Sequence, residues 1–182
     1  MLTIAGTLNL TGDLLNNGSV TGLGTLALVG KNSQDISGPG FSQFGNLSVG
    51  TAGATLNGPA TVAHALTLTG NLAVTAGQPL TLLSNAGGTA YVVNSGGGVV
   101  TGTVTVQRYI APGNPGLGYR HYSAPVTNTT VGDLATSTFA PVSNAGYNTN
   151  PTPGTTHALP HGVWLQPGAV RGLAGHGHYP RF

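Results

Sequence analysis

The chain has 182 residues, a length typical of one domain or slightly more, and only eight of them are Lys, Arg, Asp or Glu. Five scattered cations and a net charge of +2 exclude the clustered positive charge with which proteins bind nucleic acid. No apolar run reaches the roughly 18 residues of a membrane-spanning helix, and the absence of Cys excludes disulfides and thiolate metal sites. The abundant residues, 31 Gly, 25 Thr and 14 Asn, favour strands and turns over helices.

Residues 1–106 contain short segments in which every second residue is apolar, the period of a strand with one buried face. Turn signals recur in steps of about 20 residues, at 17–18, 37–38, 57–58 and 77–78, and Pro39, Pro59 and Pro79 keep the same step. The clearest strand candidates are Thr7–Thr11, Thr25–Val29, Asn46–Val49, Ala65–Thr69 and Tyr91–Val93.

A repeat of this length with two or three short strands predicts a parallel β-solenoid of about five coils over residues 1–106. Leu, Val, Ile and Ala are expected to face inward and Thr, Asn and Ser outward, with Gly at the corners. Low charge fits this fold because stacked coils align equivalent residues, so that like charges would repel and Asn or Thr side chains can hydrogen-bond. The alternative is an antiparallel sandwich, whose strands recur at about 8–12 residues.

The composition changes near Gln107. All four Arg, nine of the twelve Pro and five of the six His follow this residue. The change predicts a junction and Gly/Pro linker at 107–118, with the Gly/Pro stretch at 111–118. Beyond it we expect the start of a second, sandwich-like β module at 119–159 and an irregular tail at 160–182.

Five phrases of the sequence resemble those of large secreted surface proteins of Bacteroidetes-type bacteria. They stand in the expected order at residues 12–20 (GDLLNNGSV), 34–38 (QDISG), 44–49 (FGNLSV), 106–110 (VQRYI) and 119–126 (YRHYSAPV). Proteins of this kind are typically long, adhesin-like and exported by the type IX secretion route. The resemblance spans residues 2 to about 155.

This resemblance implies a structural or adhesive segment, without catalysis, that lies outside the cell or on its outer surface. The expected partners are glycans or proteins of the cell surface and adjoining domains of a longer parent protein. Residues 1–4 lack the regions of a signal peptide, and the chain carries no sorting tail of the expected kind. We therefore expect an internal fragment.

The tail beyond about His157 differs from the preceding chain, because the alternation of apolar and polar residues stops there. Codons can be chosen for residues 160–170 such that dropping one nucleotide yields Pro-Thr-Val-Phe-Gly-Tyr-Asn-Gln-Ala-Arg, a β-like phrase closer to the resembled proteins. We hypothesise that a single-nucleotide frameshift precedes residues 160–182, which resequencing of the locus would test.

Two constellations could carry chemistry in the second half of the chain. A metal site would use His157, His161, His176 and His178. Pro160 and Gly162 argue against a helix that would bring the first pair together, and no carboxylate joins these side chains. Nucleophilic catalysis would need His121, Ser123 and Asp133, but no Gly-x-Ser-x-Gly elbow is present. We predict no metal, cofactor or catalytic site.

A polysaccharide-degrading β-helix enzyme is one functional alternative, because glycoside hydrolysis generally uses two carboxylates. The solenoid offers only Asp13 and Asp35, which a 20-residue coil would place two positions out of register, with Lys31 not far away. We expect Asp13 to belong to a turn and Asp35 to the coil surface.

A carbohydrate-binding module is the other alternative, with Tyr119, Tyr122 and Trp164 available to stack on sugars. Ice or crystal binding would use regular rows of Thr. The candidate hydroxyls are Thr7 and Thr11, Thr67 and Thr69, and Thr101, Thr103 and Thr105. Asn, Ala and Ser are expected to interrupt such rows.

Overall fold

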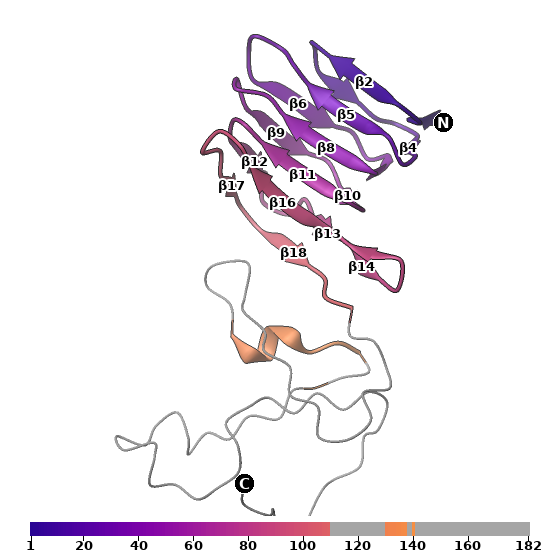
Figure 1. Ribbon diagram of the computed structural model, residues 1–182, viewed down its shortest axis with the longest axis vertical. Helices are drawn as coiled ribbons and strands as arrows, with labels where there is room; N and C mark the ends of the chain where they lie inside the picture. The colour runs from indigo at the N-terminus through magenta and orange to yellow at the C-terminus, as the bar shows by residue number, and fades with distance from the viewer. Residues whose placement is uncertain (110–129, 138–139, 141–182) are drawn as a thin grey trace, which may run out of the picture. The chain divides into compact units, whose positions relative to one another are not determined.

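The computed structural model describes residues 1–109, 130–137 and 140. The chain divides into two compact units, Met1–Tyr109 and Ile110–Phe182. The first unit is a parallel β-solenoid in which each coil contributes one strand to each of three sheets, here called sheets 1, 2 and 3 (Figure 1). This confirms the predicted fold, and the parallel pairing of successive coils excludes the antiparallel sandwich.

The strands of the three sheets follow one another in a fixed order along the chain. Sheet 1 consists of β1 (Leu2–Thr3), β4 (Ser19–Thr21), β7 (Phe41–Phe44), β10 (Ala60–Val62), β13 (Leu80–Leu82) and β18 (Val104–Val106). Sheet 2 consists of β2 (Thr7–Leu10), β5 (Thr25–Leu28), β8 (Asn46–Val49), β11 (Ala65–Leu68) and β16 (Tyr91–Asn94). Sheet 3 consists of β3 (Leu14–Leu15), β6 (Gln34–Ser37), β9 (Ala54–Asn57), β12 (Leu72–Val74) and β17 (Val100–Thr101).

The coils differ in length around the predicted period. Along sheet 1, the residues aligned on neighbouring strands are 18, 22, 18, 20 and 24 positions apart. These pairs are Leu2 and Val20, Ser19 and Phe41, Ser42 and Ala60, Ala60 and Leu80, and Leu80 and Val104. Five complete coils are therefore present, and β18 adds one further strand.

The core is a set of apolar columns that run from coil to coil. On sheet 2, Leu8 aligns with Leu26, Leu26 with Leu47, and Leu47 with Leu66. The last three are buried, while Leu8 in the first coil is half-buried. Each coil thus covers the apolar side of its neighbour, as expected for a fold whose single repeats cannot bury their own core.

Close approach of neighbouring coils fixes glycine at some corners. Gly22 has a φ of +119°, and a Cβ there would overlap the carbonyl oxygen of Ile4 in the preceding coil. Gly38, one of the predicted turn glycines, has a φ of +98°, and a Cβ there would overlap the carbonyl oxygen of Asn16. Both positions combine a left-handed backbone with lack of space, so only glycine fits without strain.

Three amide side chains hold the coils together from inside or at the corners. Asn16 is buried and donates to the hydroxyl of Ser42 at 2.9 Å and to the carbonyl of Phe41 at 3.1 Å. Gln34 is buried and donates to the carbonyls of Leu10 and Gly12. The expectation that Asn and Ser face outward is therefore wrong at Asn16 and Ser42, because each buried polar group satisfies the other.

The third amide, Asn46, links three consecutive coils. Its Nδ2 donates to the carbonyl of Leu23 at 3.2 Å in the coil before, and its Oδ1 accepts from the backbone N–H of Ala65 at 3.2 Å in the coil after. Asn16, Gln34 and Asn46 each belong to one of the phrases singled out in the sequence, at 12–20, 34–38 and 44–49. Those phrases therefore contain the side chains that fasten coil to coil.

The fifth coil carries an insertion that the periodicity did not predict. Strands β14 (Ser84–Asn85) and β15 (Gly88–Thr89) form a short antiparallel hairpin between β13 and β16 (Figure 1). The Ser84 and Thr89 hydroxyls are 2.6 Å apart, and the Oε1 of Gln107 accepts from the backbone N–H of Ser84 at 3.2 Å. The insertion explains why this coil is longer than the others.

In the second unit, the described residues form one short 3-10 helix, η1 (Val131–Leu134). The predicted Gly/Pro stretch at 111–118 and the tail at 160–182 lie outside the described residues, as does most of the module expected at 119–159.

Candidate functional site

The two acidic residues of the solenoid lie directly above each other. Leu14 aligns with Ile36, so the preceding residues Asp13 and Asp35 are in register, and the Oδ1 of Asp13 accepts a hydrogen bond of 2.8 Å from the backbone N–H of Asp35. The expectation that they are two positions out of register is wrong, because this coil is two residues longer than the predicted repeat. Both side chains are exposed, and one Asp13 oxygen is used to join the coils.

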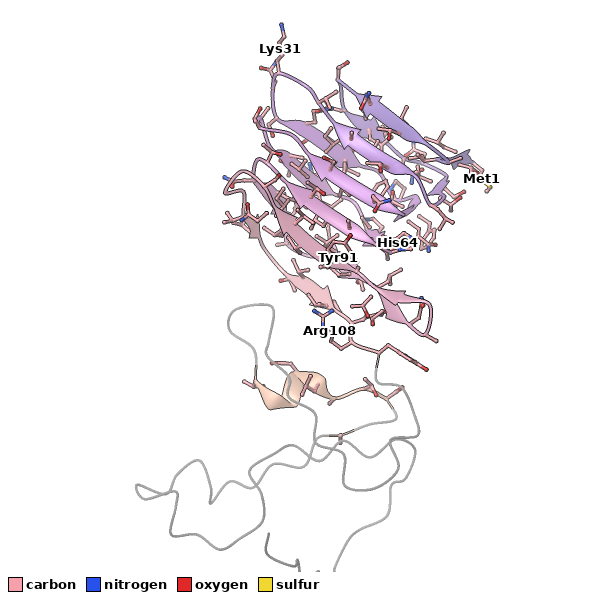
Figure 2. The ribbon with its side chains drawn as sticks, viewed as in Figure 1. Met1, Lys31, His64, Tyr91 and Arg108 are labelled. Atoms are coloured by element: carbon pink, nitrogen blue, oxygen red, sulfur yellow. The ribbon has the colours of Figure 1, made fainter. Side chains whose placement is uncertain are left out.

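Most of the other candidate metal and sugar-binding residues lie outside the described residues. Within residues 1–109, 130–137 and 140, no group of three His, Cys, Asp or Glu side chains is arranged to hold a metal ion. His157, His161, His176 and His178 are outside these ranges, as are the aromatic residues Tyr119, Tyr122 and Trp164. Figure 2 shows the Lys and Arg side chains of the described residues far from each other, Lys31 on the loop between β5 and β6 and Arg108 just beyond β18.

Of the trio His121, Ser123 and Asp133, only Asp133 is described. Its carboxylate accepts from the backbone N–H of Thr130 at 2.6 Å and from the Thr130 hydroxyl at 3.0 Å. These two hydrogen bonds lower the pKa of Asp133, the backbone bond having the larger effect. In the structure this carboxylate therefore caps the start of η1.

Sheet 1 presents a row of Thr side chains on its outer side. Alignment of neighbouring strands places one residue per coil in this row, which we call the threonine row. Its members are Thr3, Thr21, Gln43, Thr61, Thr81 and Thr105. Adjacent strands of a sheet are about 4.8 Å apart, so the six residues span about 24 Å in five nearly equal steps.

The hydroxyls of the threonine row take no part in holding the solenoid together. Those of Thr3, Thr21, Thr81 and Thr105 make no hydrogen bond to any described residue. The Oγ1 of Thr61 is covered by protein and also lacks a partner among the described residues. This contrasts with Asn16, Gln34 and Asn46, whose amides bond to the backbone or side chains of other coils.

Apolar side chains lie beside the threonine row. Phe41, Pro59 and Pro79 each lie two residues before a member of the row, and therefore on the same face of the sheet. Phe41 is 55% exposed. Leu23, at the corner that follows β4, is 76% exposed. None of the strands of sheet 1 contains a charged residue.

The Thr residues singled out in the sequence lie mainly elsewhere. Thr7 starts a row on sheet 2 that continues through Thr25, Asn46, Ala65 and Tyr91, so this row is interrupted as expected. Of those residues only Thr105 belongs to the threonine row. The signal that could have located the row is the repeat itself, because Thr61 and Thr81 are one repeat apart and Thr21 is two repeats before Thr61.

No protein-family model, no curated protein and no solved structure matches this chain. Across the described residues, the structure contains no helix long and apolar enough to cross a membrane.

Proposed function

We propose that this chain is a structural or adhesive segment of a secreted or cell-surface bacterial protein, and that its solenoid serves as a stiff rod with few charges. The observation that carries the proposal is the continuity of three parallel sheets through five coils. The resemblance of the five sequence phrases to those of adhesin-like surface proteins supports the location.

The rod is stiff because every coil is bonded to the next on three sides. Backbone ladders join the coils in each sheet, and bonds such as Gly24 N–H to the Ile4 carbonyl and Ala60 N–H to the Pro79 carbonyl extend these ladders beyond the strands. The amides of Gln34 and Asn46 add side-chain links at the corners. A coil can separate from its neighbour only if all these bonds break together.

Hydrogen exchange on the full chain tests the rod. We expect the backbone amides of β5, β8 and β11 to exchange slowly as one cooperative block, since they lie in the middle of sheet 2 with strands on both sides. Antibody labelling of intact cells of the bacterium that encodes the chain tests the location. Fast exchange throughout the central coils would contradict the rod, and labelling only after lysis would contradict the surface location.

The stacked carboxylates of Asp13 and Asp35 are the observation that favours a second function, polysaccharide cleavage. The experiment is a reducing-end assay of the full chain on neutral and acidic polysaccharides, with an Asp13→Asn, Asp35→Asn double variant as the comparison. The proposed structural function requires that the double variant and the unmodified chain release equal, background amounts of product. Product that the unmodified chain releases and the double variant does not would contradict the structural function and support polysaccharide cleavage.

A further inference from the structure

We propose that the outer face of sheet 1 binds an extended, uncharged polysaccharide chain that lies along the threonine row. The inference rests on the proposed adhesive function and gives it a ligand class and a site. Three observations carry it: the regular spacing of the row, its unused hydrogen-bonding groups, and the apolar side chains beside it.

The spacing favours a ligand that repeats. Successive members of the threonine row come from successive strands about 4.8 Å apart, along a line of about 24 Å. Hydroxyl or amide groups that a ligand can reach therefore recur at this step, and at twice this step across Thr61, whose hydroxyl is covered. A polymer of identical sugar units presents its own hydroxyls at regular intervals and can meet several members of such a row at once. The weak individual bonds then add along one chain.

Apart from the covered hydroxyl of Thr61, the hydrogen-bonding groups of the row are available to a ligand. Thr3, Thr21, Thr81 and Thr105 make no hydrogen bond to the described chain, and Thr3 and Thr105 are exposed. A hydroxyl both donates and accepts, so it can pair with sugar hydroxyls in either sense. The amide of Gln43, which stands in the third coil of the row, adds donors and an acceptor of the same kind.

The apolar side chains beside the row are suited to contact the C–H faces of a sugar ring. A pyranose ring carries hydroxyls around its edge and C–H groups on its faces. Phe41, with Pro59 and Pro79 in the next two coils, offers apolar ring surface beside the threonine row. The strands of sheet 1 lack charge, which favours a neutral ligand over an acidic polysaccharide or a phosphate-bearing one.

The same face argues against an ice or mineral surface. A planar crystal face needs an unbroken array of exposed hydroxyls. Here Gln43 takes the place of a Thr in the third coil, and the hydroxyl of Thr61 in the fourth coil is covered by protein. The exposed Thr hydroxyls therefore form two short groups and not a continuous array.

Binding of the full chain to microcrystalline cellulose, chitin and soluble mixed-linkage β-glucan tests the proposal, with polygalacturonate as the acidic comparison. A Thr21→Val, Thr81→Val double variant removes two free hydroxyls while keeping the branched shape, and we expect it to weaken retention on the neutral glycans about tenfold. Phe41→Ala is expected to weaken retention by a similar factor, because it removes the apolar ring surface beside the row.

Two control variants make the same Thr→Val substitution at positions where we expect no contact with the ligand. Thr61→Val stands in the threonine row, but its hydroxyl is covered by protein and cannot reach a ligand. Thr67→Val lies on the outer side of sheet 2. Both should bind as the unmodified chain does, and equal unfolding curves for all variants would show that the fold is kept.

No retention on any neutral glycan would overturn the proposal, as would equal weakening by Thr67→Val. Inhibition of ice recrystallisation without glycan retention would also overturn it and favour the crystal-binding alternative. None of these results would contradict the proposed structural function, because hydrogen exchange tests the rod separately.

Discussion

The side-chain amide of Asn16 donates a hydrogen bond of 2.9 Å to the hydroxyl of Ser42 in the following part of the solenoid. Both residues are buried, at 6% and 3% exposure, and the Ser42 hydroxyl has its buried hydrogen bond from Asn16. The Oδ1 of Asn16 also accepts from the backbone N–H of Gly18 at 3.0 Å. One side chain thus fixes a corner within its own coil and joins that corner to the next coil.

Replacing Asn16 should therefore destabilise the solenoid. In Asn16→Ala, the hydroxyl of Ser42 and the carbonyl of Phe41 lose a buried partner, which is expected to cost about 1–3 kcal/mol in the free energy of unfolding. Chemical denaturation followed by circular dichroism measures the change. Asn17→Ala is the control, because Asn17 is the exposed neighbour in the same turn. An equal loss in both variants would show that the effect belongs to the turn and not to the buried bonds.

The corner glycines allow two causes of strain to be separated. Gly77 and Gly22 both have positive φ, at +80° and +119°, but a Cβ at Gly77 would meet open space. Gly77→Ala should cost about 1 kcal/mol, since only the left-handed backbone is unfavourable there. Gly22→Ala should cost clearly more, because its Cβ would also overlap the Ile4 backbone. Thermal unfolding of the two variants gives the comparison, and similar losses would mean that the coils can move apart at this corner.

The sequence was most informative about sheet 2. All five strands predicted by alternation, including Thr25–Val29 and Ala65–Thr69, correspond to strands of this sheet. Its inward positions hold Leu or Val in most coils, so the pattern is clear. Sheets 1 and 3 were not predicted strand by strand, because several of their strands have only two or three residues and because buried polar residues such as Ser42 and Gln34 break the alternation.

The candidate surface was less predictable than the fold for a related reason. A row across coils depends on register, and register depends on the length of each coil. A fixed step of 20 residues aligns Thr61 with Thr81. The same step does not align Asp13 with Asp35, because their coil is two residues longer. Insertions such as the β14–β15 hairpin lengthen the step again, so Thr81 aligns with Thr105 across a still longer coil. Sequence periodicity therefore predicts the repeat but not which side chains share a row.

The pH dependence of η1 follows from the bonds between Asp133 and Thr130. These bonds favour the ionised carboxylate, so the pKa of Asp133 should lie below the ordinary value of 3.8. A group whose folded pKa is lowered stabilises the fold above its unfolded pKa, and this contribution is lost as the pH falls through the folded pKa. A carboxyl titration of the full chain by NMR measures the midpoint. Thr130→Val should raise it only in part, because the backbone N–H, which has the larger effect, remains. A midpoint at or above 3.8 in the unmodified chain would contradict the capping interaction.

The covered hydroxyl of Thr61 predicts a substitution that does not destabilise. Its Oγ1 is shielded from solvent and has no hydrogen-bond partner in the described chain, so it has lost its bonds to water without replacing them. Thr61→Val replaces this hydroxyl with a methyl group of similar size and keeps a β-branched side chain suited to a strand. We expect the free energy of unfolding to stay equal or to rise by up to about 1 kcal/mol. Chemical denaturation measures this change, with Thr81→Val beside it as the reference, because Thr81 occupies the next position of the same row and its hydroxyl is not among the covered ones. A loss of stability specific to Thr61→Val would mean that the Thr61 hydroxyl has a partner in solution and therefore contributes to the packing of sheet 1.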